Sequence, residues 1–102
     1  MTEDDKYHQL LTVSNPITVQ KKLNEYLPGT QLYLSTRRTK KYMIQQPNGK
    51  WSHFGDILFQ DFTKHKDKDR RRRYIQRASN IRGNWINDPY SSNMLSICLL
   101  WN

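Results

Sequence analysis

Hydrophobic residues recur along this chain with two different periods, which predict where its helices and strands lie. From residue 17 to about residue 27, apolar side chains such as Ile17, Val19 and Leu23 recur at helical spacing. A capping side chain and a proline precede this segment, and Pro28-Gly29 follows it. We therefore predict an amphipathic helix over residues 17–27.

Three short segments then alternate with a period of two, at residues 31–35, 41–45 and 51–54. A basic turn joins the first two segments, and Asn48-Gly49 lies between the second and the third. Asn-Gly is the strongest short signal for a hairpin, because both residues accept a positive φ. The sequence thus predicts a three-stranded antiparallel meander, whose apolar face needs a helix to cover it.

The residues after the meander form an aromatic junction. Gly55-Asp56 is predicted to break the third strand. Residues 57–62 fit either a short helical turn or an extended link, and we expect Phe59 and Phe62 to pin this segment to the core.

A strongly basic helix is predicted next, beginning at a cap on Asp67 or Asp69 and running through residue 82. Its apolar positions follow the spacing i, i+1, i+4 and i+7 from residue 74, which gives one helical face. Arg70, Arg73 and Arg77 recur at i, i+3 and i+7, so they form a basic stripe beside that face.

Together these elements predict an α+β fold, a small three-stranded antiparallel meander with about three helices. The last helix covers residues 93–101 and is apolar nearly all round, so we expect it to be buried or docked. Residues 1–13 are predicted to form an N-terminal arm, and residues 14–102 a single α+β domain. Only 35% of the residues are apolar and the mean hydropathy is −0.95, so the core is thin and such a domain leans on a partner.

The single cysteine and the lack of long apolar runs limit the setting of the protein. Cys98 has no partner for a disulfide within the chain, and its apolar surroundings predict a small buried residue. No apolar run approaches the roughly 18 residues of a membrane span. The acidic start is unlike a signal peptide. We expect a reducing intracellular setting, or a particle assembled there.

The net charge of +8 is concentrated in the middle of the chain. Residues 37–82 hold 14 Lys and Arg against four Asp, whereas the remainder holds three against five Asp and Glu. A basic middle of this kind attracts polyanions or acidic protein surfaces. The predicted interface or polyanion-binding residues are Arg37, Arg38, Lys64, Lys66, Lys68, Arg70, Arg71, Arg72, Arg73 and Arg77.

No arrangement of residues predicts a reaction, a cofactor or a metal site. His65-Lys66-Asp67 lacks the H-x-K spacing that would place His and Lys against one phosphate. His53 and His65, with Asp56 and Asp61 nearby, are not spaced as metal ligands, and Asp61 and His65 lack a partner nucleophile. An exposed face of Tyr42, Trp51 and Phe54 would imitate a surface that stacks on single-stranded nucleic acid.

An ordered string of motifs covers residues 40–101: KKYMIQQPNGKWSHFGD, DFTKHKD, RRRRYIQRASNIRGNW and DPYSSNMLSICLLW. This string resembles short uncharacterised proteins of large nucleocytoplasmic DNA viruses and related viruses. Ser92 departs from their pattern, in which Pro is frequent before the last helix.

The resemblance implies a viral origin and no known enzymatic activity, and it transfers no catalytic residues. It implies a minor capsid or capsid-associated protein that binds neighbouring virion proteins. The location would be the virion and, during assembly, the host cytoplasm or virus factory. The alternative is a basic, nucleoid-associated viral protein that binds DNA or RNA.

Overall fold

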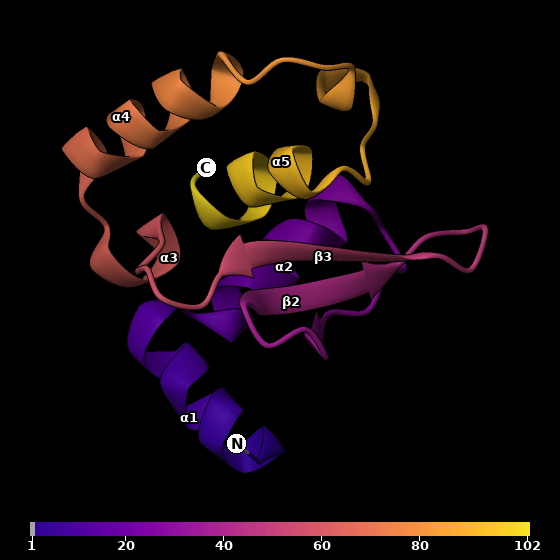
Figure 1. Cartoon of the computed structure of the whole chain (residues 1–102), viewed down its shortest axis with the longest axis vertical. Helices are drawn as coiled ribbons and strands as arrows, with labels where there is room; N and C mark the ends of the chain where they lie inside the picture. The colour runs from indigo at the N-terminus through magenta and orange to yellow at the C-terminus, as the bar shows by residue number, and fades with distance from the viewer. Residues whose placement is uncertain (1) are drawn as a thin grey trace.

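The computed structural model describes residues 2–102 and shows an α+β fold, in which helices pack around a three-stranded antiparallel sheet (Figure 1). The strands β1 (Tyr33–Leu34), β2 (Lys40–Gln45) and β3 (Trp51–Asp56) lie in sequence order. The helices are α1 (Glu3–Val13), α2 (Pro16–Tyr26), α3 (Phe62–His65), α4 (Lys68–Ser79) and α5 (Ser92–Leu95), with a 3-10 turn η1 (Trp85–Asn87) and a π-helical turn η2 (Ser96–Leu100). The predicted fold class is confirmed, with five α-helices in this part of the chain instead of about three.

The predicted hairpin between β2 and β3 is confirmed. Gly49 has a φ of 87°, and the backbone N–H of Gln46 donates to the carbonyl of Lys50 at 2.7 Å. In the resulting register Tyr42 pairs with Phe54, and both side chains are almost fully buried. This pair marks the face of the sheet on which the core lies.

β1 is shorter than the predicted segment 31–35, and the residues that precede it bond to a helix. The N–H of Leu32 donates to Oε1 of Gln20 on α2 at 3.0 Å, and the side chain of Gln31 donates to the same oxygen at 3.1 Å. These bonds hold the residues before β1 against α2.

α2 and the segment α5–η2 pack against the sheet and against each other. Val19 and Leu23 of α2 and Leu99 of η2 are fully buried, which confirms the predicted burial of the last helix. Ile17 is 72% exposed, so the buried face of α2 is narrower than predicted, and Cys98 is partly buried beside the core. None of the helices within residues 2–102 is long and apolar enough to cross a membrane.

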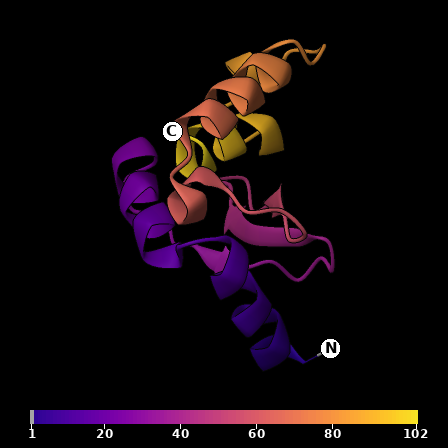
Figure 2. The same ribbon diagram turned by 90° about the vertical axis from the view of Figure 1, so that its left-hand side faces the viewer.

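The segment predicted as an N-terminal arm forms helix α1, which projects from the sheet end of the molecule (Figure 2). The side chain of Thr2 caps it in a capping box with Asp5. Leu10 and Val13 at its base belong to the core, and the buried Lys6 donates from Nζ to the carbonyls of Ser35 and Arg37 at 2.5 and 2.6 Å. Its base is thus fixed to the body, while its first turn is exposed.

The prediction that Gly55-Asp56 breaks the third strand is wrong, because β3 continues to Asp56, which pairs with Lys40. Gly55 has a φ of 82°, and a Cβ there would lie 2.9 Å from Cδ1 of Leu100 and 3.1 Å from Cβ of Lys41. The glycine allows β3 to continue while η2 approaches its backbone closely.

Gly55→Ala should lower the free energy of unfolding by about 2–4 kcal/mol, because the new methyl group adds overpacking to the cost of a positive φ. Urea unfolding followed by circular dichroism measures this change. Gly49→Ala is the matched control, since Gly49 has nearly the same φ but nothing within 4 Å of the added Cβ. Gly49→Ala should lower the free energy of unfolding by only about 1–2 kcal/mol. Equal losses of stability in the two variants would contradict the packing argument.

Candidate functional site

Two consecutive helix caps set the direction of the basic helix. Asp61 accepts the N–H of Thr63 at 3.0 Å and caps α3, which ends at Lys66 in a left-handed conformation with a φ of 56°. Asp67 then caps α4 by accepting the N–H groups of Asp69 and Arg70, so one of the two predicted caps is confirmed. The chain turns between the two caps, which aims α4 away from the end of β3.

A narrow strip of contacts holds α4 against the body. The rings of Tyr74 and Trp101 stack with their centroids 4.3 Å apart and their planes 9° apart. His65 lies 5.2 Å from the same tryptophan, and Asn93 donates to the carbonyl of Ala78, the one fully buried residue of α4. α4 ends at Ser79 rather than at residue 82, and Ile81 beyond it is 53% exposed.

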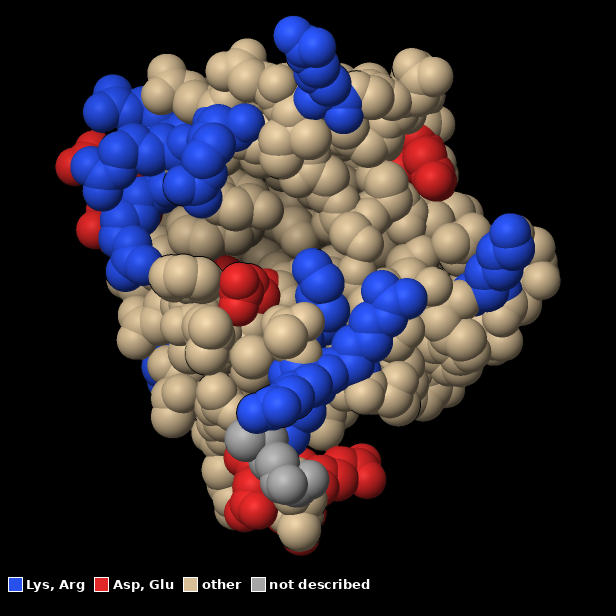
Figure 3. Space-filling model, in the orientation of Figure 1, with Lys and Arg blue, Asp and Glu red and all other residues tan. Residues whose placement is uncertain are grey.

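Beside this strip, α4 and the body enclose a groove of about 770 Å³ (Figure 3). α4 and the residues after it form one wall, and the sheet end with the segment after β3 forms the other. The C-terminal segment forms the floor. The lining residues are Arg70, Arg73, Tyr74, Arg77 and Ile81 on the first wall, Lys40, Lys41, Gly55, Asp56, Phe59 and Gln60 on the second, and Ser92, Asn93, Ser96, Leu100 and Trp101 on the floor.

The groove carries an excess of unneutralised positive charge. Within residues 2–102, Arg70, Arg73 and Arg77 form no ion pair, and neither does Lys40 across the groove. Asp56 is the acidic residue among the lining residues, and one of its oxygens accepts the N–H of Leu58 at 2.9 Å. Because a concave surface concentrates the field of such charges, the groove should attract anionic groups.

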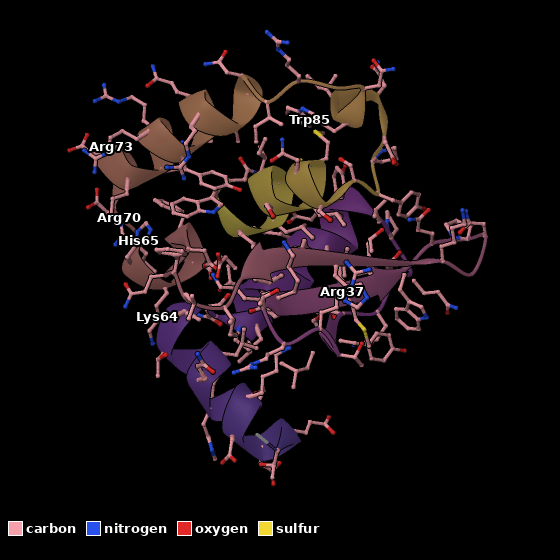
Figure 4. The ribbon with its side chains drawn as sticks, viewed as in Figure 1. Arg37, Lys64, His65, Arg70, Arg73 and Trp85 are labelled. Atoms are coloured by element: carbon pink, nitrogen blue, oxygen red, sulfur yellow. The ribbon has the colours of Figure 1, made fainter. Side chains whose placement is uncertain are left out.

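The ten predicted cationic residues do not form one surface. The structure brings the stripe of Arg70, Arg73 and Arg77 together in the groove. Arg71 lies over the ring of Phe62 at 5.0 Å, and Arg72 is exposed, 3.9 Å from Asp69. Figure 4 labels two of the other five, Lys64 and Arg37. All five lie outside the groove lining, on or just after α3, at the first residue of α4, or in the turn after β1: Lys64, Lys66, Lys68, Arg37 and Arg38.

Sequence reasoning missed the second wall of the groove. Lys40 begins β2 and faces α4 across the groove, although 30 residues or more separate it from the stripe in the sequence. Asn93 and Ser96 were predicted only as parts of an apolar helix. The single local signal for this wall was the pair Lys40-Lys41, and the sequence does not indicate which of these two lysines is neutralised by an ion pair.

Lys41 is the lysine that is not free, because it forms a buried ion pair with Asp61. Nζ and Oδ2 lie 3.0 Å apart, and the two side chains are 3% and 0% exposed. Burial lowers the pKa of Lys41, and the neighbouring Asp61 opposes that shift. Asp61 also accepts a hydrogen bond from the hydroxyl of Thr63, and neither Asp61 nor His65 lines the groove.

The ion pair belongs to a polar network that joins four elements. Oγ1 of Thr63 accepts the N–H of Asn15 at 2.9 Å and lies 3.3 Å from Oγ of Ser14. The hydroxyl of Tyr42 donates to that serine at 2.6 Å. This network therefore connects β2, the α1–α2 junction and the start of α3 in the interior, which supports the position from which α4 begins.

The surroundings of His53 and His65 disfavour the protonated form of both side chains. Nδ1 of His65 accepts the N–H of Asp67 at 2.8 Å, and its Nε2 is buried without a hydrogen-bond partner among residues 2–102. Burial and the nearby Arg70 lower the pKa of His65. Burial and the nearby Arg37 likewise lower the pKa of His53, whose Nδ1 lies 2.7 Å from Oγ of Ser35. Within residues 2–102 no group of three or more His, Cys, Asp or Glu could hold a metal ion.

The aromatic residues of the sheet divide between its two faces. Tyr42 and Phe54 are buried in the core, so they do not form the base-stacking face considered from the sequence. Trp51 is 42% exposed and contacts Tyr33 edge to face, with centroids 5.6 Å apart. Of the two junction phenylalanines, Phe62 packs against the core, whereas Phe59 is 60% exposed at the groove, which corrects the prediction for Phe59.

Comparison with known proteins gives one match. Residues 30–78 match the profile of a family of unknown function, DUF5754. The matched part includes the sheet, α3 and most of α4, which provide both walls of the groove except for Ile81, but it does not include the floor. No curated protein and no solved structure matches the chain.

Asp61→Asn should lower the free energy of unfolding by about 3–5 kcal/mol, because it leaves the buried Lys41 without its counter-charge. The amide keeps an oxygen that can cap α3, so the loss reports the ion pair. Lys41→Met combined with Asp61→Asn should recover at least about half of this loss. Chemical denaturation of the two single variants and the double variant measures the coupling, and strictly additive losses would exclude it.

Lowering the pH from about 7 to 5 should destabilise the protein, because His53 and His65 bind protons more readily in the unfolded chain. The pKa of each histidine is lower in the folded protein than in the unfolded chain. The contribution of these two groups to stability is therefore fully present above the unfolded-state pKa, and it is lost as the pH falls through the folded-state pKa. Thermal unfolding across this pH range should show the decrease, and His53→Gln with His65→Gln should flatten it. An unchanged slope in that double variant would assign the decrease to other groups.

Proposed function

We propose that this protein is a non-enzymatic structural component of a large DNA virus particle, a minor capsid or capsid-associated protein that binds neighbouring protein chains. One observation carries the binding role: Arg70, Arg73 and Arg77 line a groove in which no carboxylate of residues 2–102 pairs with them. Arginines placed in this way favour a partner that brings carboxylates, since the guanidinium group binds them in bidentate geometry.

The apolar surface around these arginines favours a protein partner. Phe59 and Ile81 are 60% and 53% exposed at the groove, and Tyr74, Leu100 and Trp101 provide further apolar lining. Protein interfaces combine aromatic and aliphatic anchors with arginine in this way. The chemistry that fits is a chain segment with both acidic and apolar side chains.

The direction of the arginine stripe argues against α4 as a reader of duplex DNA. A recognition helix inserts its contacting side chains into a major groove about 12 Å wide. The side chains of Arg70, Arg73 and Arg77 instead line a concave space between α4 and the body. A single extended or helical segment fits this space better than a duplex does.

Binding of DNA or RNA is the second candidate function, and two observations favour it. The net charge is +8, and Tyr33 and Trp51 expose aromatic surface on the sheet. In this case all ten predicted cationic residues would contribute to affinity, and not only those in the groove. The viral origin and the location in the virion rest on the resemblance of residues 40–101 described above.

The protein should bind short synthetic peptides of Asp, Glu and Leu, and Arg73→Ala with Arg77→Ala should weaken this binding about tenfold or more. Fluorescence anisotropy with labelled peptides measures the affinity. Lys21→Ala with Lys50→Ala removes the same charge from exposed positions outside the groove and is the matched control. In purified particles, the groove should cross-link to capsid chains.

Duplex DNA and single-stranded RNA, titrated at several salt concentrations, separate the two candidates. Tight binding with a steep salt dependence, weakened by Arg37→Ala with Arg38→Ala as much as by the groove variant, would replace the protein-binding proposal with the nucleic-acid one. If Lys21→Ala with Lys50→Ala weakens peptide binding as much as Arg73→Ala with Arg77→Ala does, the binding depends on total charge. The groove would then be excluded as the peptide-binding site.

A further inference from the structure

The molecule carries an acidic surface at the opposite end from its basic groove. The first turn of α1 exposes Glu3, Asp4 and Asp5, and Figure 3 shows acidic side chains gathered at the lower end, away from the arginines of α4. We name this turn the acidic tip. Lys6, directly after the tip, and Leu10 and Val13 at the base of α1 hold this helix against the body, so the tip is held away from the groove of its own chain (Figures 1 and 2).

The acidic tip has charge available for a partner. Glu3 and Asp4 form no ion pair within residues 2–102, while Asp5 is engaged in the capping box with Thr2. Tyr7 and Leu11 follow on the same helix and are 45% and 36% exposed. Asp4, Tyr7 and Leu11 are spaced i, i+3 and i+7, so the exposed face of α1 places an acidic group ahead of two apolar ones.

The groove has cationic and apolar side chains that complement the acidic and apolar side chains of α1. Arg73 and Arg77 stand on one wall with Lys40 opposite, and the exposed Ile81 and Phe59 lie at the groove beside these charges. One turn of an α-helix, about 5 Å long and about 10 Å across, occupies on the order of 400 Å³. The groove of about 770 Å³ therefore has room for the first turn of a helix.

We infer that the acidic tip of one copy of this chain docks in the basic groove of a second copy. This inference rests on the proposed function and identifies one of its neighbouring chains as another copy. The two surfaces differ, so the contact is heterologous, and a pair of copies keeps one free tip at one end and one free groove at the other. Repetition of the contact builds a ring or a filament, which is a suitable form for a protein that lines a particle.

Sedimentation velocity of the purified full chain tests the inference, with circular dichroism to show that each variant is folded. The wild-type protein should sediment faster as its concentration rises at low salt, and this increase should vanish at high salt, because exposed charges are screened. Glu3→Lys with Asp4→Lys, and separately Arg73→Glu with Arg77→Glu, should each remain monomeric. Glu3→Gln with Asp4→Asn removes the charge without opposing the helix dipole and should also weaken association about tenfold or more.

Mixing the two charge-reversed variants gives the decisive result. The arginine variant keeps a normal tip and the lysine variant keeps a normal groove, and the reversed tip also complements the reversed groove. An equimolar mixture should therefore associate, although neither variant associates alone. A monomeric wild type, a mixture that stays monomeric, or association that persists in either variant would overturn the inference. If acidic peptides still bind the groove in that case, the proposed function stands with a different partner; if they do not, both fail.

Discussion

The structure depends on the buried ion pair between Lys41 and Asp61. A charge that is fully removed from water is tolerated only when a partner and hydrogen bonds satisfy it. Here the hydroxyls of Ser14, Tyr42 and Thr63 complete the network around the pair. The network ties the middle strand to the α1–α2 junction and to the first turn of α3, so three segments distant in sequence meet at one interior point.

The position of α4 follows from this point and from few other contacts. α3 is one turn long and begins at Asp61, and α4 starts directly after it. Further along, the stack of Tyr74 on Trp101 keeps the helix close to the body, and its arginines line the space between the two. A groove with unneutralised arginines is the consequence, and a domain with such a groove and a small core gains stability when a partner binds there.

The local signals in the sequence predicted individual elements well and their mutual contacts poorly. The hairpin at Asn48-Gly49, the cap on Asp67 and the arginine stripe follow from backbone preference and helical period, which act over a few residues. The errors lie where a distant group intervened. Gln20 of α2 binds the residues before β1, and Gly55 allows β3 to continue where Leu100 lies close to its backbone.

The sequence by itself determined the fold class, the basic helix and the spacing that places Arg70, Arg73 and Arg77 on one face. Tertiary structure alone decided that this face encloses a groove and that the acidic first turn of α1 stands apart. It also decided that Lys41 is paired, whereas Lys40 forms no ion pair in the described part of the chain. The physical reason is that the periodicity of a helix fixes which side chains are neighbours along one element. Which charges are buried or neutralised depends on segments brought together from distant parts of the chain.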